Sequence, residues 1–384
     1  MKKQILNLAI CAGLGLYSIN ALATVDYSTG GTANSVGFAS NVSSTTLTNS
    51  GSILDVKFDI GKGVNDGVER YMRIDLHGAE GTEWGTTLND SDLTALASAG
   101  GTPVISIAQG GTGSDTYVIY LVKPVGAAFA ATDELSFNPG VITSGDTSGL
   151  NFSYRMYESI TAAANPDNTA SLKLAELSNK AYVRFLKPYK LTLTSTPLTA
   201  DVATGFTEFT GTTVAKTGEL VAITIAADTN LMTAGGGSIS TLSDVIGDSD
   251  LIFKGDFLMN FSQDMTDDTQ ETAALERVFL SDSACTTAFS SDRATDAFAE
   301  DGSTATFNLT TASDMTSATY SKSFCLTANT GSDTGNITGE IPEQLYTVDF
   351  VTTAATNMST YDYLNGSAGK ILHNGAQLIT PFFT

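Results

Sequence analysis

Basic residues are scarce in this chain, in which 19 Lys and Arg stand against 41 Asp and Glu for a net charge of −22. Recognition of nucleic acid needs clustered positive charge that attracts phosphates, so the composition argues against a nucleic-acid partner. The same excess of carboxylates argues against binding to an anionic lipid surface. Positive ions or a cationic partner are the compatible classes.

Histidine is nearly absent too, since His77 and His373 are the only two. A serine triad uses a histidine as its base, yet neither lies beside a GxSxG motif, which the chain does not contain. The glycine-rich stretch 109–115 (QGGTGSD) has no P-loop lysine. We therefore expect no enzyme. A secreted hydrolase that uses paired carboxylates stays as an alternative, because no spacing among 41 acids singles out a pair.

Long apolar runs are also missing, and none reaches the roughly 20 residues of a membrane helix. The run from Ile5 to Leu16 follows two lysines and precedes the small residues Ala21–Ala23. This order is typical of a secretory signal peptide, for which we expect residues 1–23 to be removed. The sequence thus predicts export through the Sec pathway to the cell surface or medium, rather than to the periplasm, without membrane insertion.

Cysteine is limited to three residues. Cys11 lies in the apolar part of the leader after Ile10, where a lipid-attachment site would need a small residue. In an exported protein the remaining pair, Cys285 and Cys325, is most simply a disulfide. The chain-entropy model gives about 4 kcal/mol for closing the loop 285–325. Two unpaired thiols are the alternative.

The most abundant local pattern is alternation of apolar and polar residues. In residues 53–60 (ILDVKFDI) the apolar side chains of Leu54, Val56 and Phe58 fall on one face. Residues 68–78 (VERYMRIDLHG) and 150–157 (LNFSYRMY) alternate in the same way, while 117–122 (YVIYLV) is wholly apolar and indicates a covered, central strand. Turn residues separate these runs. We predict an all-β fold of antiparallel sandwiches, Ig-like or jelly-roll-like, with short helical turns only.

The length favours two domains. A small, polar segment containing Pro166, at 159–172, indicates a boundary between one sandwich at 24–160 and a second at 170–384. A brief helical pattern is expected at 172–181 (LKLAELSNKA). The second half continues with strand-like runs, in which Gly255 is expected to kink one strand and Asn374–Gly375 to form a tight hairpin turn.

Acidic residues concentrate between Asp228 and Asp314. Calcium prefers six to eight oxygen ligands, commonly from Asp carboxylates in loops, so this stretch predicts a Ca²⁺ site. A solvated acidic surface is the alternative, since no EF-hand pattern is present. The candidate ligands are Asp248, Asp250, Asp264, Asp267 and Asp268.

A second polar group brackets Trp84, the one tryptophan. An aromatic ring beside carboxylates and amides is typical of sugar-binding sites, in which the ring packs on the sugar. The candidate residues are Trp84, Glu83, Asp90 and Asp92, and the candidate ligand is a cell-surface polysaccharide. The alternative for a lone tryptophan is packing at a domain edge.

Several stretches together resemble secreted surface-layer-like proteins of Gram-negative bacteria. They are VERYMRIDL, ADVATGF (200–206), ERVFLSDSAC (276–285), SFCLT (323–327) and ILHNGAQLITPFF (371–383). The resemblance is one of order and composition along most of the chain. It implies two β-sandwich parts, no catalytic residues and a structural role in self-assembly, with calcium-dependent cohesion. It also implies a further strand after the last hairpin, so either the chain is short or a neighbouring subunit supplies that strand.

From these features we expect an exported, non-catalytic surface protein that assembles with copies of itself into a layer or filament. An adhesin or carbohydrate-binding protein is the first alternative.

Overall fold

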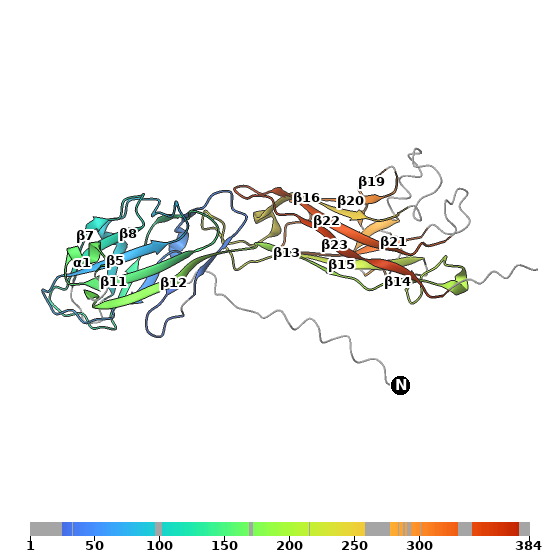
Figure 1. The fold of residues 1–384 in the computed structure, drawn as a ribbon. Coiled ribbons are helices and arrows are strands. Elements are labelled where there is room, and N and C mark those ends of the chain that lie inside the picture. The colour runs from blue at the N-terminus through green and yellow to red at the C-terminus, as the bar shows by residue number, and fades with distance from the viewer. Residues whose placement is uncertain are drawn as a thin grey trace, which may run out of the picture. The chain divides into compact units, whose positions relative to one another are not determined.

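The computed structural model describes residues 25–32, 34–96, 102–168, 172–214, 216–257, 277–282, 284–286, 289, 293–299, 301–328 and 340–375. Strands dominate these residues, and α1 (Ile160–Ala164) is a single short turn of α-helix (Figure 1). The described 3₁₀ turns are η1 (Ser50–Ser52), η2 (Asp90–Asp92), η4 (Val202–Thr204) and η5 (Leu242–Asp244). The all-β prediction is confirmed.

The chain divides into two compact units. Unit 1 holds residues 1–37 and 46–184, and unit 2 holds 38–45 and 185–384. The boundary predicted at 160–170 therefore falls inside unit 1. The reason is strand β12 (Ala175–Leu186), which pairs with β11 (Leu150–Tyr157) and so keeps the chain in the first unit.

The helical pattern expected at 172–181 is wrong, because β12 occupies most of that stretch. Its pairing with β11 shifts register next to Asn179, which adopts a positive φ of 49°. A bulge of this kind breaks the period-two alternation by which a strand is recognised. The alternation in residues 172–181 is therefore interrupted, and the strand was not recognised from the sequence.

Unit 1 is a sandwich of unequal sheets. The smaller sheet has the order β1 (Val25–Asp26), β4 (Val56–Asp59), β9 (Glu134–Phe137), β6 (Leu93–Leu96). The larger has the order β2 (Val36–Ala39), β12, β11, β5 (Arg70–His77), β8 (Tyr117–Lys123), β7 (Val104–Gly110), and a separate ribbon pairs β10 (Val141–Thr143) with β3 (Thr46–Thr48). The pair β1–β4 is parallel, while β3–β10, β4–β9, β6–β9, β5–β8, β7–β8, β5–β11 and β11–β12 are antiparallel.

The core of unit 1 lies between its sheets. Phe58 of β4 packs on Phe152 and Tyr154 of β11, with ring centroids 5.5 and 4.5 Å apart. The apolar faces predicted by alternation in β4, β5 and β11 are the buried faces. Strand β8 is second from the edge rather than central, and its Ile119 is buried because α1 packs over the outer face of the sheet.

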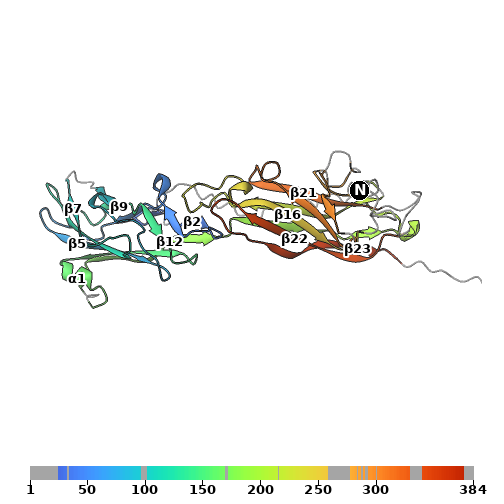
Figure 2. The same cartoon turned by 90° about the horizontal axis from the view of Figure 1, so that it is seen from above.

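Unit 2 is a second sandwich (Figures 1 and 2). One sheet has the order β13 (Tyr189–Thr194), β15 (Thr217–Ala227), β21 (Thr319–Thr327), β17 (Val278–Ser281), β18 (Arg293–Ala294). The other, called the C-terminal sheet below, has the order β14 (Leu198–Ala200), β23 (Tyr363–His373), β22 (Gln344–Ala354), β16 (Ile246–Lys254), β20 (Thr304–Leu309), β19 (Ala297–Phe298).

The chain passes from one sheet of unit 2 to the other between β13 and β14, and aromatic rings pack between the two sheets. Strand β13 pairs antiparallel with β15, and the chain then changes sheet so that β14 pairs parallel with β23. Between the sheets, Phe253 of β16 stacks on Phe324 of β21 with ring centroids 3.6 Å apart. Gly255 follows β16, where an added Cβ would lie 2.3 Å from the ring of Tyr346. Because glycine has no Cβ, the backbone at residue 255 can pack closely against the ring of Tyr346.

Candidate functional site

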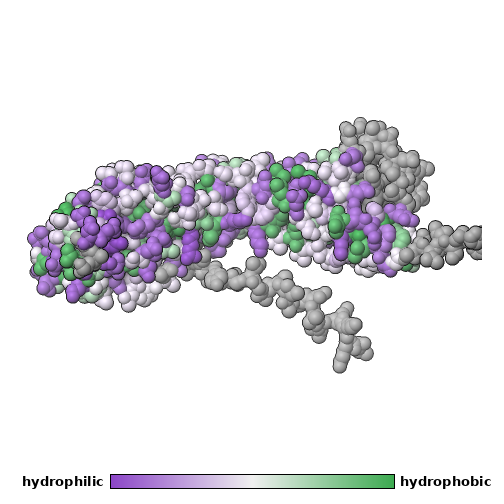
Figure 3. All heavy atoms as spheres, in the orientation of Figure 1, coloured by the Kyte–Doolittle hydropathy of each residue, from purple (hydrophilic) through white to green (hydrophobic). Residues whose placement is uncertain are grey.

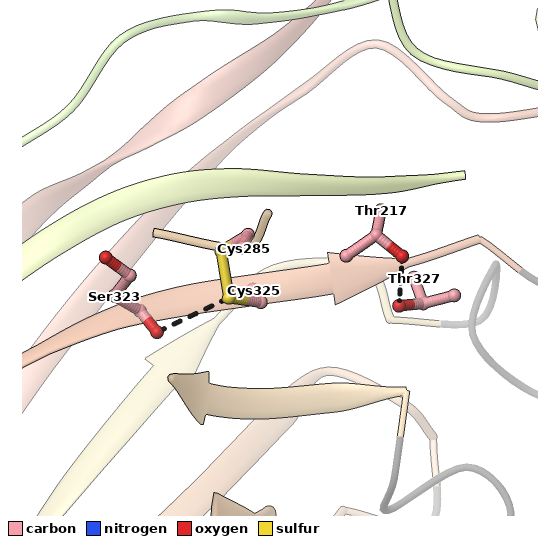
Figure 4. The surroundings of a disulfide bond; sticks show 5 residues. All are labelled: Thr217, Cys285, Ser323, Cys325 and Thr327. Carbon is pink, nitrogen blue, oxygen red and sulfur yellow. Dashed lines mark hydrogen bonds between the residues drawn. A yellow bond between two sulfur atoms is a disulfide. The ribbon is translucent and has the colours of Figure 1, made fainter. Parts of the chain in front are cut away.

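The predicted disulfide is present in unit 2. Cys285 and Cys325 are bonded, with their Cα atoms 5.6 Å apart (Figure 4). Cys325 lies within β21, between Phe279 of β17 on one side and Glu219 of β15 on the other. The bond therefore ties the turn after β17 to the strand that β17 already pairs with.

The surroundings of the disulfide are apolar. Both cysteines are buried and pack with Phe279 and the half-buried Phe289. Ala284 and Cys285 have positive φ values of 51° and 57°, a backbone region that L-residues rarely adopt. A buried cross-link that holds an unfavourable turn is a structural element.

The metal-ligand candidates are only partly described. Asp264, Asp267 and Asp268 lie outside the described residues. Asp248 uses Oδ1 to accept hydrogen bonds from the N–H and hydroxyl of Thr311, at 2.7 and 3.0 Å. Asp250 lies two residues further along β16. Within the described part of the chain, no three His, Cys, Asp or Glu side chains gather as a metal site would require. The calcium site stays a prediction.

The carboxyl of Asp250 lies near a second acid, Asp296. Partial burial and, after it, the charge of Asp296 raise the pKa of the Asp250 carboxyl above its usual value. The carboxylate of Asp296 also accepts a hydrogen bond of 2.8 Å from the N–H of Asn308 on β20. These two acids repel each other in the absence of a cation.

The proposed sugar site around Trp84 does not have the geometry that a surface platform needs. The indole is 0 % exposed and packs edge-on against Phe137, with ring centroids 5.4 Å apart. Asp90 accepts the Ile107 N–H at 2.7 Å, and Asp92 accepts the Asn89 N–H at 2.8 Å. These carboxylates cap backbone groups, while Glu83 forms an isolated bridge with Thr143 through its backbone. Trp84 is a core residue, so it offers no ring face to a sugar.

The two histidines lie in different units and each is engaged structurally. Nε2 of His77 lies 2.9 Å from the hydroxyl of Ser153, which itself accepts the N–H of Asn179 at 2.9 Å. The ring of His373 stacks on Phe206 at 3.9 Å, and its Nε2 lies 2.7 Å from the carbonyl of Ile341. Ser153 is buried at 1 % exposure, so its hydroxyl holds the sheet and the imidazole in place.

A site that sequence reasoning missed is the outer face of the C-terminal sheet. Leu345 of β22 is 73 % exposed, and Leu364 and Leu372 of β23 are 59 % and 36 % exposed. β22 and β23 lie side by side, with Leu345 opposite Lys370. Apolar patches are visible over these strands among polar atoms (Figure 3). We call this surface the leucine face, and it consists of Leu345, Thr347, Asp349, Leu364, Lys370, Leu372, Asp250 and Lys254.

The leucine face carries charges of both signs. Lys254 and Lys370 lie on it with Asp250 and Asp349, and the Lys254 ammonium lies 2.5 Å from the Asp349 carboxylate. Two further acids adjoin it, namely Asp296 beside Asp250 and Glu343, which accepts the N–H of His373. Burial by itself would raise the pKa of Asp349, but the Asn365 N–H and Lys254 outweigh it and hold this pKa below its usual value.

The signal for this face is present in the sequence. Leu345 directly precedes Tyr346, and Leu372 directly follows Ile371. In a strand, neighbouring residues point to opposite faces, so two consecutive apolar residues place one of them on the outer face. Tyr346 and Ile371 are the buried members of these pairs.

The described sheet edges of unit 2 are poorly suited to adding a strand. β14, β18 and β19 have two or three residues each, which limits the ladder they can offer. β13 is longer, but the hydroxyl of Tyr363 donates to the carbonyl of Tyr189 at 2.8 Å and accepts the N–H of Leu191. This phenol therefore occupies backbone groups on the free edge of β13.

Comparison with known proteins adds no assignment, since no family model and no curated sequence matches this chain. Among the described residues, no helix has the length and apolar character needed to cross a membrane.

Proposed function

We propose that this chain is an exported, non-catalytic structural protein of the cell surface that self-assembles into a layer or filament, with the leucine face as the contact between copies. The observation that carries the proposal is the set of three exposed leucines on neighbouring strands. Apolar side chains grouped on one surface are a mark of protein–protein contact.

The choice of a second copy as the partner rests on charge. With a net charge of −22, two copies repel each other over most of their surfaces. The leucine face carries two lysines among its acids, so lysines of one copy can meet aspartates of the other across a two-fold axis or in a repeating array.

Export and surface location are supported by the leader-like residues 1–23 and by the disulfide, which persists in oxidising compartments. We further propose that Ca²⁺ strengthens the assembly by binding acids such as Asp250 and Asp296, whose mutual repulsion a divalent cation would relieve.

The test is sedimentation velocity and negative-stain microscopy of the purified protein, without its leader, in calcium and in chelator. We expect concentration-dependent association and regular assemblies in calcium. L345D should weaken self-association at least tenfold, because central apolar contacts dominate interface energy. The matched control is L172D in unit 1, which makes the same change at a residue 56 % exposed.

Both variants should fold, since both leucines are exposed. A protein that stays monomeric at high concentration in calcium would refute self-assembly. Equal loss of association in L345D and L172D would refute the leucine face as the contact.

A further inference from the structure

A polar hollow of about 460 Å³ lies at one end of the larger sheet of unit 1. Its lining comes from three adjacent segments, namely the end of β5, the start of β11 with the loop before it, and β12. The pairing brings them together, because Asn151 of β11 lies opposite His77 of β5 on one side and Ala181 of β12 on the other. All lining residues belong to unit 1.

Part of the lining of the hollow is apolar. Leu150 and Val183 line it and are almost fully buried. Gly149 beside them has a φ of +103°, and an added Cβ would lie 2.8 Å from the carbonyl oxygen of Val183. Any other residue at 149 would strain the backbone and press on β12, so glycine keeps this space free.

His77 is held in a fixed orientation at this site. Its Nε2 lies 2.9 Å from the hydroxyl of Ser153, which also accepts the N–H of Asn179. This bond uses one ring nitrogen and leaves the other for a ligand, as donor or acceptor according to the tautomer.

Two further polar side chains have unused capacity. Arg184 is exposed and, within the described residues, pairs with no carboxylate. Its described electrostatic neighbour is the phenol of Tyr27, where its positive charge partly offsets the burial that raises the pKa of Tyr27. The described residues likewise offer no hydrogen-bond partner to the side-chain amide of Asn151, which lines the hollow. A guanidinium presents a planar fork of donors that matches a carboxylate, and an amide both donates and accepts.

The lining contains no carboxylate, although acids outnumber bases by 41 to 19 in the chain. Asp146 lies just outside, where its Oδ1 accepts the N–H and hydroxyl of Ser148 at 2.8 and 2.6 Å. These two bonds, the hydroxyl first, lower the pKa of Asp146, so it stays ionised at the rim. Among the lining residues themselves, the charged group is the Arg184 guanidinium.

We propose that this hollow binds a carboxylate-bearing sugar, such as a uronic acid residue of a surface polysaccharide. Arg184 holds the carboxylate, while Asn151 and the second ring nitrogen of His77 bond the hydroxyls. The volume falls in the range of pockets that hold small ligands. The inference rests on the proposed surface location for its biological setting, and it gives the protein a means of retention by binding.

The test is isothermal titration calorimetry at physiological ionic strength, where salt screens the repulsion between the acidic protein surface and the anionic ligand. The probes are a trigalacturonate, a neutral maltotriose and inorganic phosphate. The variants are R184Q and N151A. The control is K62Q, which removes one positive charge from an exposed residue of unit 1 outside the hollow.

We expect saturable binding of trigalacturonate that R184Q weakens at least tenfold, N151A weakens severalfold and K62Q leaves unchanged. Maltotriose should not bind, and phosphate at equal concentration should not displace the uronate. The proposal is overturned by absent uronate binding, by equal binding of maltotriose, by displacement with phosphate, or by equal effects of R184Q and K62Q.

Failure here is distinguishable from failure of the assembly proposal. R184Q should sediment and assemble as the unaltered protein does, and L345D should bind trigalacturonate normally.

Discussion

At the scale of single residues, Trp84 shows how burial changes the role of a side chain. Its indole lies in the core of unit 1 against Phe137, and within the described residues its Nε1 has no hydrogen-bond partner. It is also the one tryptophan of the chain. Tryptophan fluorescence of the whole protein therefore reports on this core.

We predict a blue-shifted emission that iodide does not quench, and a loss of about 3–5 kcal/mol in the free energy of unfolding for Trp84→Ala, the usual cost of truncating a buried aromatic. Fluorescence and urea unfolding measure both. A red-shifted, quenchable indole would show that the ring is at the surface.

The disulfide predicts a second residue-scale effect. Replacing both Cys285 and Cys325 by serine should lower the stability of unit 2 by about 2–4 kcal/mol, because the loop that joins them, with a sequence separation of 40, regains freedom in the unfolded chain. Urea unfolding followed by far-UV circular dichroism measures the loss. An unchanged midpoint, or two thiols titratable in native protein, would contradict the bond.

Two aspartates on the leucine face should respond to pH with opposite sign. The pKa of Asp349 is lowered by Asn365 and Lys254 against the effect of burial, so its ionised form stabilises the fold above about pH 4 and this contribution is lost as pH falls. The pKa of Asp250 is raised by burial and Asp296, so its ionisation destabilises the fold as pH rises.

Consequently, Asp349→Asn should cost about 1 kcal/mol at pH 7, as expected for a charged hydrogen-bonded group, and little at pH 3. Asp250→Asn should stabilise at pH 7, by about 0.5 kcal/mol or less because solvent screens this half-exposed group, and have no effect at pH 3. Thermal unfolding of dilute protein in chelator measures both differences. The same sign for the two variants at pH 7 would contradict the assignments.

At the scale of elements, the strand β7 is an edge that local chemistry protects. Its N-terminal neighbour Pro103 has no N–H, and the outward N–H of Ile107 is taken by Asp90 at 2.7 Å. Next to this point the pairing with β8 shifts register between Ile107 and Gln109. The exposed Val104 at the start of the strand would otherwise mark an edge open to pairing.

Asp90→Ala should expose this edge and increase β-type aggregation. The matched control is Asp301→Ala, which removes a similar cap, the 3.0 Å bond to the Ser303 N–H, from a turn. Each variant should lose about 1 kcal/mol, but only Asp90→Ala should bind thioflavin T on prolonged incubation. Equal aggregation of the two variants would contradict a special role for the edge.

Elements also show what sequence patterns can predict. Alternation located β4, β5 and β11 and their buried faces because one face of each meets the other sheet. It failed at β12, where the bulge at Asn179 interrupts the period, and it missed α1, whose small residues are buried by contact with Ile119 and Tyr157. The pairing of β12 with β11, which sets the extent of unit 1, depends on contacts between strands and has no local signal.

The candidate sites follow the same rule. The pairing of Cys285 with Cys325 was predictable, because these are the two cysteines outside the predicted leader and each has the other as its candidate partner. The role of Trp84 was not, since its burial depends on Phe137 of a distant strand. The hollow beside Arg184 was not either, because its lining is assembled from three strands that only the pairing brings together.

At the scale of the whole molecule, the proposed assembly depends on charge. Copies with a net charge of −22 repel each other over most of their surfaces, and the proposal places their contact at the leucine face, which carries exposed leucines and two lysines. Added salt should therefore favour assembly by screening general repulsion, whereas contacts made of ion pairs would weaken.

The most direct measurement places a photoreactive benzoylphenylalanine at Thr347, in the middle of the leucine face, and identifies the cross-linked peptides in assembled protein. The account predicts cross-links between copies that join residue 347 to peptides of β22 and β23. Cross-links that map to other surfaces, or none under conditions where particles are visible, would contradict it.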